Sequence, residues 1–294
     1  MQWQSQFSRT ALAQRAFPMP QRAGGGFSKT RLLIGVVMAV VALFSYFTSS
    51  VYNPVTGENQ YVSITERQEI ALGLQSAPQM AQQYGGLHPD QSAQQLVDRV
   101  GRSVVARSAA AQSGYPFDFH LLADPQTVNA FALPGGQVFL TAGLLKRLET
   151  EGQLAGVLGH EVGHVVARHS AQHIAQQELT QGLTGAVILS TYDPDNPASG
   201  KTAAIAAIIG NLVNLKFGRE DELQSDQLGV RFMSEAGYDP RSLIGVMRIL
   251  DQASGGSQQA EFFSTHPNPE NRMRRIEQAI VETFPQGVPD GLRE

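Results

Sequence analysis

The stretch "LAGVLGHEVGHVVARHS", residues 154–170, decides both the fold and the chemistry of this chain. His160 and His164 are four residues apart, so on a helix they lie on one face and can direct ring nitrogens at the same ion. Glu161 lies about 100° further round the helix, where it is well placed to take a proton from a metal-bound water. We therefore interpret this stretch as a helix of a divalent-metal site. The alternative is a core helix whose histidines only form hydrogen bonds.

A catalytic zinc takes three protein ligands and keeps one position open. A third histidine six residues after His164 is excluded, because that position is Ser170. The later segment "GREDELQSDQLGVRFMSEAG", residues 218–237, supplies carboxylates, with Glu222 and Asp226 on one face of a predicted helix. One carboxylate can bind the ion while the other accepts a hydrogen bond from a ligating histidine. Spacing alone leaves both residues open as the ligand.

The small and aliphatic residues of these two helices predict how they pack. Four aliphatic residues fall opposite the histidines and predict the core side: Leu154, Leu158, Val162 and Val165. Gly156, Gly163 and Ala167 lie near the histidines, where we expect them to leave room for an ion and a substrate. Gly229 shares the face of Glu222, so we expect it to let the later helix approach closely.

Composition excludes several classes of function. The net charge is −4, and no basic block with interleaved aromatic residues is present, so we expect no nucleic-acid partner. The chain has no cysteine, which removes disulfides, thiol catalysis and cysteine-ligated zinc. Any metal must therefore be held by histidine and carboxylate.

The N-terminal segment predicts a membrane anchor. Residues 1–31 contain five basic residues and no acid, the first acid being Glu58, and they precede the apolar run "LLIGVVMAVVALFSYF", residues 32–47. That run gives about 24 Å of helix, or about 30 Å if it extends through Val51, so we expect one transmembrane helix over 32–51. The positive-inside rule then places the N-terminus in the cytoplasm and the remainder in the periplasm of a Gram-negative bacterium. An acid-free N-terminus also suits a mitochondrial presequence, which makes the mitochondrial inner membrane the alternative.

We expect an α+β fold that is mainly helical, with a small antiparallel sheet. Alternating apolar residues predict two strands, 117–122 and 137–141, around a turn at 134–136. Helical periodicity runs from 144 to about 177, and two short apolar runs within 180–218 predict core or groove-lining helices, with a membrane-dipping hairpin as the alternative. The first helix of the domain should begin at Thr65, and the last at Asn268–Pro269. The expected segments are a basic tail (1–31), the anchor (32–51), a connector (52–64), the folded domain (65–285) and a flexible tail (286–294).

Four ordered blocks resemble the zinc endopeptidases of the CAAX prenyl protease and HtpX heat-shock protease family. The resemblance covers about residues 65–283 and is closest to the branch with a single anchor and a periplasmic or mitochondrial catalytic domain. The blocks are "NAFALPGGQVFLTAGLL" (129–145), "HEVGHVVARHS" (160–170), "EDELQSDQLG" (220–229) and "THPNPENRMRRI" (265–276).

The resemblance implies a zincin-type metalloprotease domain with one Zn²⁺. His160, His164 and Glu222 would be its ligands and Glu161 the general base, while Asp226 matches a carboxylate that supports the ligands. Ser225, which stands where the family usually has a small alanine, is a departure from the pattern.

The last block adds two candidate site residues. His266 is at a position where it could donate to the developing oxyanion or cap the zinc in a resting state, and Arg272 could hold substrate carbonyls or a carboxylate. The strand at 135–141 could pair with an extended substrate, with a plain buried strand as the alternative.

The resemblance thus implies a membrane-anchored zinc-dependent endopeptidase that hydrolyses peptide bonds with metal-activated water. As family-level expectations, its substrates are misfolded or membrane-associated proteins in envelope protein quality control, and its N-terminal helix contacts lipid. A zinc-stabilised chaperone or adaptor without hydrolytic activity is the main alternative, and a metal-free helical scaffold is a third.

Overall fold

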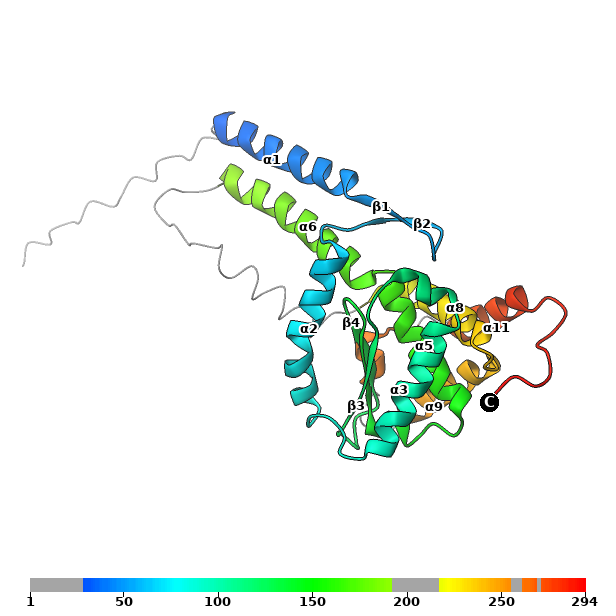
Figure 1. The fold of residues 1–294 in the computed structure, drawn as a ribbon. Helices are drawn as coiled ribbons and strands as arrows, with labels where there is room; N and C mark the ends of the chain where they lie inside the picture. Colours follow the sequence, from blue (N-terminus) through cyan, green and yellow to red (C-terminus); the bar gives the residue numbers. More distant parts are fainter. Residues whose placement is uncertain (1–28, 192–216, 255–260, 269–270) are drawn as a thin grey trace, which may run out of the picture.

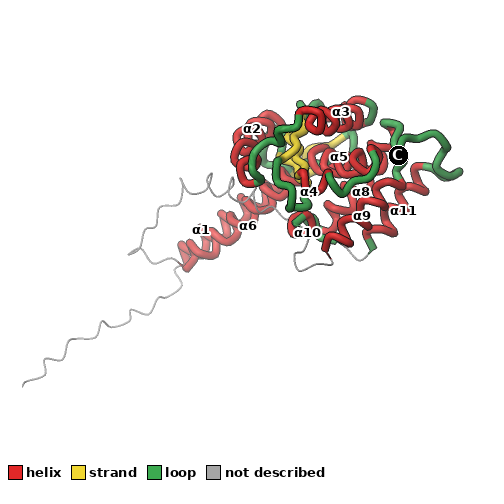
Figure 2. Tube along the Cα trace, turned by 90° about the horizontal axis from the view of Figure 1, so that it is seen from below, coloured by secondary structure: helices red, strands yellow, loops and turns green. Residues whose placement is uncertain are grey.

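A computed structural model of the protein describes residues 29–191, 217–254, 261–268 and 271–294. Helices surround a three-stranded sheet, and two further helices, α1 and α6, project side by side from this body (Figures 1 and 2). The basic tail before residue 29 and most of the second apolar run, from 192 to 216, lie outside the described residues.

The central sheet is mixed, which corrects the expected antiparallel sheet. Its strands are β3 (Asp118–Leu122), β4 (Ala130–Leu133) and β5 (Gln137–Thr141), in the order β3-β5-β4. β3 runs parallel to β5, whereas β4 pairs antiparallel with β5. The two predicted strands are present. The turn at Gly135 and Gly136, however, joins β5 to β4, a strand that was not predicted from the sequence. Both glycines have positive φ (79° and 106°), a conformation that favours glycine.

β5 lies between two partners, so its backbone is already paired on both sides. The expectation that residues 135–141 pair with a substrate is therefore wrong. The outer edge of β3 is also covered, because the side chain of Gln94 donates to the Phe119 carbonyl (2.8 Å) and accepts from the Leu121 N–H (2.8 Å).

The helices of the body begin and end at identifiable signals. The helix predicted to begin at Thr65 is confirmed: Thr65 and Gln68 form a capping box at the start of α2. The periodic segment after 144 is divided in three. Residues 146–150 separate α4 from α5, and Arg168, which has a φ of 55°, separates α5 from α6. The last helix begins at Arg272, not at Asn268–Pro269. The helices are α2 (Glu66–Gln83), α3 (Gln91–Ala106), η1 (Ala109–Ser113), α4 (Ala142–Leu145), α5 (Glu151–Val166), α6 (His169–Thr191), α8 (Arg219–Glu235), α9 (Arg241–Ser254), α10 (Phe262–Thr265) and α11 (Arg272–Thr283).

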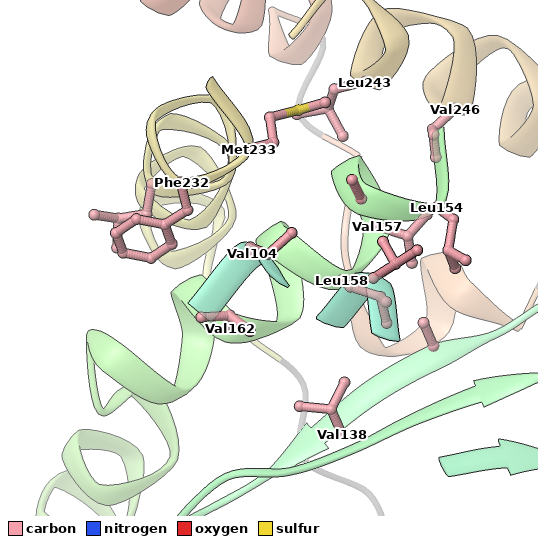
Figure 3. Close-up of a cluster of buried hydrophobic side chains, with 14 of the residues drawn as sticks. Val104, Val138, Leu154, Val157, Leu158, Val162, Phe232, Met233, Leu243 and Val246 are labelled. Carbon is pink, nitrogen blue, oxygen red and sulfur yellow. The ribbon is translucent and has the colours of Figure 1, made fainter. Parts of the chain in front are cut away.

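Helix α5 runs through the middle of the core, between α8, α3 and the sheet (Figure 3). Its four aliphatic residues predicted to face the core are all buried, at 4% exposure or less. They pack with Val104 of α3, Val138 of β5 and Phe232 and Met233 of α8 in one continuous cluster. His160 and His164 are therefore carried by a helix whose residues from Gly152 to Val166 are all buried, so close packing restricts their side chains.

The segment before the domain differs from expectation. α1 (Lys29–Thr48) ends before residue 50, because β1 (Ser50–Asn53) and β2 (Glu58–Tyr61) form an antiparallel hairpin in the expected connector. The predicted extension of the anchor through Val51 is therefore wrong, and the apolar run remains about 24 Å long. Within the described residues, no helix has the length and apolar character needed to cross a membrane. The transmembrane helix expected over 32–51 is thus not borne out.

α1 packs on α6 and exposes its apolar side chains. A methyl group placed on Gly182 of α6 would lie 2.9 Å from the β-carbon of Ala42, so the two helices approach closely. Val41 and Phe44 are 60% and 70% exposed. At the other end of the chain, the expected flexible tail is held to the body, since the Arg293 N–H donates to the Gly237 carbonyl (3.0 Å).

Candidate active site

Four side chains from three parts of the chain meet beside α5. His160 and His164 come from α5, Glu222 from α8 and His266 from the residue after α10, and their ligand atoms all lie within 4.8 Å of one another. Nε2 of His160 is 3.1 Å from Nε2 of His164, and Oε1 of Glu222 is 3.4 Å from the latter. Nδ1 of His266 lies 3.0 Å from Oε1 of Glu222 and 3.4 Å from Nε2 of His160. All four residues are buried. The structure therefore brings together the three residues predicted as ligands and adds His266.

This donor set suits a zinc ion. Zinc–ligand bonds of about 2.0–2.1 Å place neighbouring ligand atoms of a tetrahedral site about 3.3 Å apart, and four of the donor pairs here are 3.0–3.4 Å apart, in a set whose atoms all lie within 4.8 Å. Within the described part of the chain, the buried Nε2 of His266 has no hydrogen-bond partner, and Oε2 of Glu222 has none beyond its ion pair with Nη1 of Arg272 (3.1 Å). Groups that converge in this way without satisfying one another are typical of a site that binds an ion.

Glycines on α5 and α8 bring the two helices into backbone contact. A β-carbon on Gly229 would lie 3.1 Å from the backbone nitrogen of His160, and one on Gly163 would lie 3.0 Å from the Ser225 carbonyl oxygen. The predicted close approach at Gly229 is confirmed. The expectation that Gly156 and Gly163 leave room for an ion and a substrate is wrong, because Leu243 and α8 fill those positions.

Asp226 and Arg272 support the His160 side of the cluster. Asp226 Oδ1 is 2.9 Å from Nδ1 of His160, and Arg272 donates to both oxygens of Asp226 (2.7 and 2.9 Å). Burial acts to raise the pKa of Asp226, but Arg272 and His160 outweigh it and hold that pKa below its usual range. Because the ionised carboxylate accepts the Nδ1 proton of His160, Nε2 of that ring keeps its lone pair for a metal. Arg272 is only 1% exposed and is bound to Asp226, which does not favour the predicted contact with substrate.

Glu161 is a buried carboxylate without a structural partner. It is fully buried, and neither of its oxygens has a hydrogen-bond partner among the described residues. Its nearest charged-pair contact is Nε2 of His266, 3.6 Å from Oε1. Burial raises the pKa of Glu161 more than His266 and His160 lower it. A carboxylate of this kind beside a metal site can accept and return a proton.

Sequence reasoning missed two aromatic residues of the site. The ring of Phe217 stacks on His164 with a centroid distance of 3.9 Å, and Phe262 stacks on His266 at 4.4 Å. Both phenylalanines are buried and restrict the orientation of the imidazoles. Neither lies in a periodic pattern or at a motif spacing, so no sequence signal identifies them.

Comparison with known proteins identifies the family. Residues 91–280 match the family model described as peptidase family M48. The chain belongs to this family. It is 33% identical to a mitochondrial metalloendopeptidase OMA1 of Schizosaccharomyces pombe over 81% of this chain and 68% of the relative. It is 30% identical to the mitochondrial metalloendopeptidase OMA1 of Danio rerio over 85% of this chain and 54% of the relative.

A third relative comes from bacteria. The chain is 29% identical to a beta-barrel assembly-enhancing protease of Escherichia coli over 61% of this chain and 37% of that protein. This M48 chain thus spans about half or less of the length of the last two relatives. The zinc-endopeptidase family predicted from the four sequence blocks is confirmed, and the chain is a metalloendopeptidase.

Proposed function

We propose that this M48 chain is a membrane-associated, zinc-dependent endopeptidase, with His160, His164 and Glu222 as zinc ligands. The observation that carries the proposal is the meeting of these three donors with Glu161, a buried carboxylate that has no hydrogen-bond partner in the described residues. A buried carboxylate without hydrogen bonds destabilises the fold, so its presence here is best explained by a role in the chemistry. His266 holds the fourth corner of the cluster and caps it in this arrangement.

Zinc bound by these residues would lower the pKa of a bound water towards about 7 and polarise the scissile carbonyl. Glu161 is placed to accept a proton from that water and would return it to the leaving amine. Asp226 keeps His160 in the tautomer that presents Nε2, and Arg272 keeps Asp226 ionised.

An extended substrate would pair with β4, which replaces the incorrect expectation for β5. The Asn129 carbonyl accepts from Thr141 and so points towards β5, whereas the Val128 carbonyl accepts from the Phe262 N–H (3.1 Å) and points outward. Because directions alternate along a strand, the backbone groups of Ala130 and Ala132 also point to the outer edge. This edge borders a cavity lined in part by Ala132 and His266. Backbone pairing there would read the shape of an unfolded chain in preference to its sequence.

The membrane role rests on α1, whose apolar side chains are largely exposed. We propose that α1 contacts lipid at the membrane surface and that the catalytic domain lies in the periplasm. The mitochondrial inner membrane is the alternative compartment. Substrates would be misfolded or membrane-associated proteins, as in envelope quality control. A reporter fused to the C-terminus distinguishes the two sides of the membrane.

The deciding experiment compares wild type with Glu161→Gln in zinc content and casein hydrolysis. The variant should keep one zinc per chain and lose at least about 100-fold in rate, because only the proton acceptor is removed. His160→Ala is the matched control that should lose the zinc as well. Equal hydrolysis by wild type and Glu161→Gln would refute the mechanism and favour a zinc-stabilised chaperone or adaptor.

A further inference from the structure

A chain of hydrogen bonds joins His164 to the β1–β2 hairpin. Gln224 of α8 donates through Nε2 to Oε2 of Glu58 in β2 (2.6 Å), and its Oε1 lies 2.8 Å from Nε2 of His169. Nδ1 of His169 lies 2.9 Å from Nδ1 of His164. Three elements besides α5 therefore contribute residues to this series of hydrogen bonds. We call it the His164 hydrogen-bond chain, and its members are Glu58, Gln224, His169 and His164.

The chemistry of the groups fixes the direction of every bond in the chain. A carboxylate such as Glu58 can only accept, so the amide of Gln224 must turn its NH₂ towards Glu58 and its oxygen towards His169. His169 must then carry its proton on Nε2, which leaves a lone pair on Nδ1. His164 must donate from its own Nδ1, and its Nε2 is left as the acceptor that faces the metal-ligand cluster.

Other groups around His169 are compatible with this direction. Asp221 Oδ1 lies 3.8 Å from Nε2 of His169 and also favours a proton there, although the main partner of Asp221 is His173 (2.7 Å). The Ser225 hydroxyl is 3.4 Å from Nδ1 of His169 and is a longer, competing donor.

The hairpin that carries Glu58 is itself fixed to α5. Asn53 donates to the Val166 carbonyl (2.7 Å) and Gln60 donates to the Ala167 carbonyl (2.8 Å). These bonds satisfy carbonyl groups at the end of α5, where Gln172 also donates to the Ala167 carbonyl (2.8 Å). The hairpin thus holds Glu58 in a fixed place relative to the metal-ligand cluster.

We propose that His169 is a positioning residue that sets the tautomer of His164, and that Gln224 and Glu58 orient His169 for this task. The proposal rests on the proposed zinc site and deepens it. The two ligating histidines would then be supported differently: His160 by the charged pair Asp226–Arg272, and His164 by a neutral imidazole. His169 itself does not belong to the group of possible metal ligands found in the described residues.

The first test compares His169→Ala with His169→Asn in the full chain held in detergent micelles. Zinc affinity is measured by competition with a chromogenic chelator, and the ligand set by the absorption spectrum of the Co²⁺-substituted protein. His169→Ala should bind zinc about 10–100-fold more weakly, as is common on loss of a group that supports a ligand. His169→Asn should recover most of this loss, because its Oδ1 can accept the His164 proton in place of Nδ1. The Co²⁺ bands should keep their shape, since the ligands are unchanged.

Equal losses in both variants, or no loss in His169→Ala, would overturn the proposal. So would a Co²⁺ spectrum showing that removal of His169 deletes a ligand. If wild type itself binds no zinc, the proposed function fails, and that result is distinct from a failure of the His164 hydrogen-bond chain alone.

The second test changes Glu58, at the exposed end of the His164 hydrogen-bond chain, where a substitution does not threaten folding. Glu58→Lys replaces an acceptor by a donor, so the Gln224 amide should turn over and His169 should move its proton from Nε2 to Nδ1. Glu220→Lys, an equal change of charge at an exposed residue of α8, is the matched control. Long-range ¹H–¹⁵N spectra of ¹⁵N-histidine-labelled protein should show the Nε2–H form of His169 in wild type and Glu220→Lys and the Nδ1–H form in Glu58→Lys. An Nδ1–H form in wild type, or the same form in all three proteins, would overturn the proposal.

Discussion

Two buried charged clusters each take residues from the stretch 160–168 and are built on opposite principles. In the Glu69–Arg168 pair, Arg168 donates through Nε to Glu69 (2.8 Å) and through Nη2 to the Ile64 carbonyl (3.0 Å), while the Tyr115 hydroxyl also donates to Glu69 (3.2 Å). None of these side chains is among the buried groups without a hydrogen-bond partner. The metal-ligand cluster and the two residues packed against it, Glu161 and Arg272, by contrast hold most of the buried atoms without a hydrogen bond in the described chain: both oxygens of Glu161, Nε2 of His266, and Oε2 of Glu222 and Nη1 of Arg272, which face each other only as an ion pair at 3.1 Å.

The difference separates stability from function. An unsatisfied buried polar group costs about 1–3 kcal/mol, so a cluster that keeps several of them is not optimised for folding. The Glu69–Arg168 pair joins α2 to the corner between α5 and α6, and it contributes no atom to the buried groups without a hydrogen-bond partner, as expected of a structural pair. Four measurements on the free energy of unfolding can break or sharpen this comparison.

Arg168→Met should give the largest loss of stability, about 3–5 kcal/mol, because it leaves the Glu69 carboxylate buried and unpaired. Denaturant unfolding of the detergent-solubilised chain measures the change. The double variant Glu69→Gln/Arg168→Met should recover much of the loss, since no buried charge remains. A double variant as unstable as the single one would show that Arg168 acts through packing or the backbone.

The pH dependence of the single variant gives an independent check. Burial already raises the pKa of Glu69 above 4.5 in the native protein, despite Arg168. Removing Arg168 raises it further, so the native state binds more protons than the unfolded state, and stability should fall as pH rises from about 4.5 through the raised pKa. Zinc-ligand variants leave the pair intact, so the part of the slope that comes from Glu69 should cover only the narrower pH range that its already raised pKa gives wild type.

Removal of zinc should give the next largest effect and should act only through the metal-ligand cluster. Zinc bound to the native state at 100 times its dissociation constant contributes about 2.7 kcal/mol, which a chelator removes. Glu222→Gln should unfold at the same denaturant concentration with and without chelator, because it no longer retains the ion. If chelation left wild type unchanged, the contrast between the two clusters would lose its basis.

The sequence predicts the parts of this site that follow from helix geometry. The placement of His160 and His164 depends only on the repeat of one helix, and Glu222, Asp226 and Gly229 on that of another, so both faces could be assigned. The seam where the two helices touch is marked by glycine, which made the close approach predictable as well.

Features that depend on distant partners could not be predicted. β4 is four residues long, and the order β3-β5-β4 follows from contacts that no local pattern contains. The break at Arg168 carries neither glycine nor proline and is held by Glu69 from another helix. His169 could be placed on or off the surface only once Gln224 and Glu58 were known to reach it.

An exposed ion pair should give the smallest loss in the free energy of unfolding. Arg99 of α3 lies 3.1 Å from Glu151 at the start of α5, with side-chain exposures of 59% and 28%. Arg99→Ala should cost about 0.2–1 kcal/mol, because water screens the pair and Glu151 keeps its hydrogen bond from the Tyr238 hydroxyl (2.9 Å). The cost should shrink further when the unfolding measurement is repeated at high salt, whereas the cost of Arg168→Met should not, since salt does not screen a buried pair effectively. If Arg99→Ala cost as much stability as Arg168→Met, burial would not explain the contribution of the Glu69–Arg168 pair to the free energy of unfolding. The two clusters would then differ only in the buried atoms without hydrogen bonds that lie beside the metal ligands.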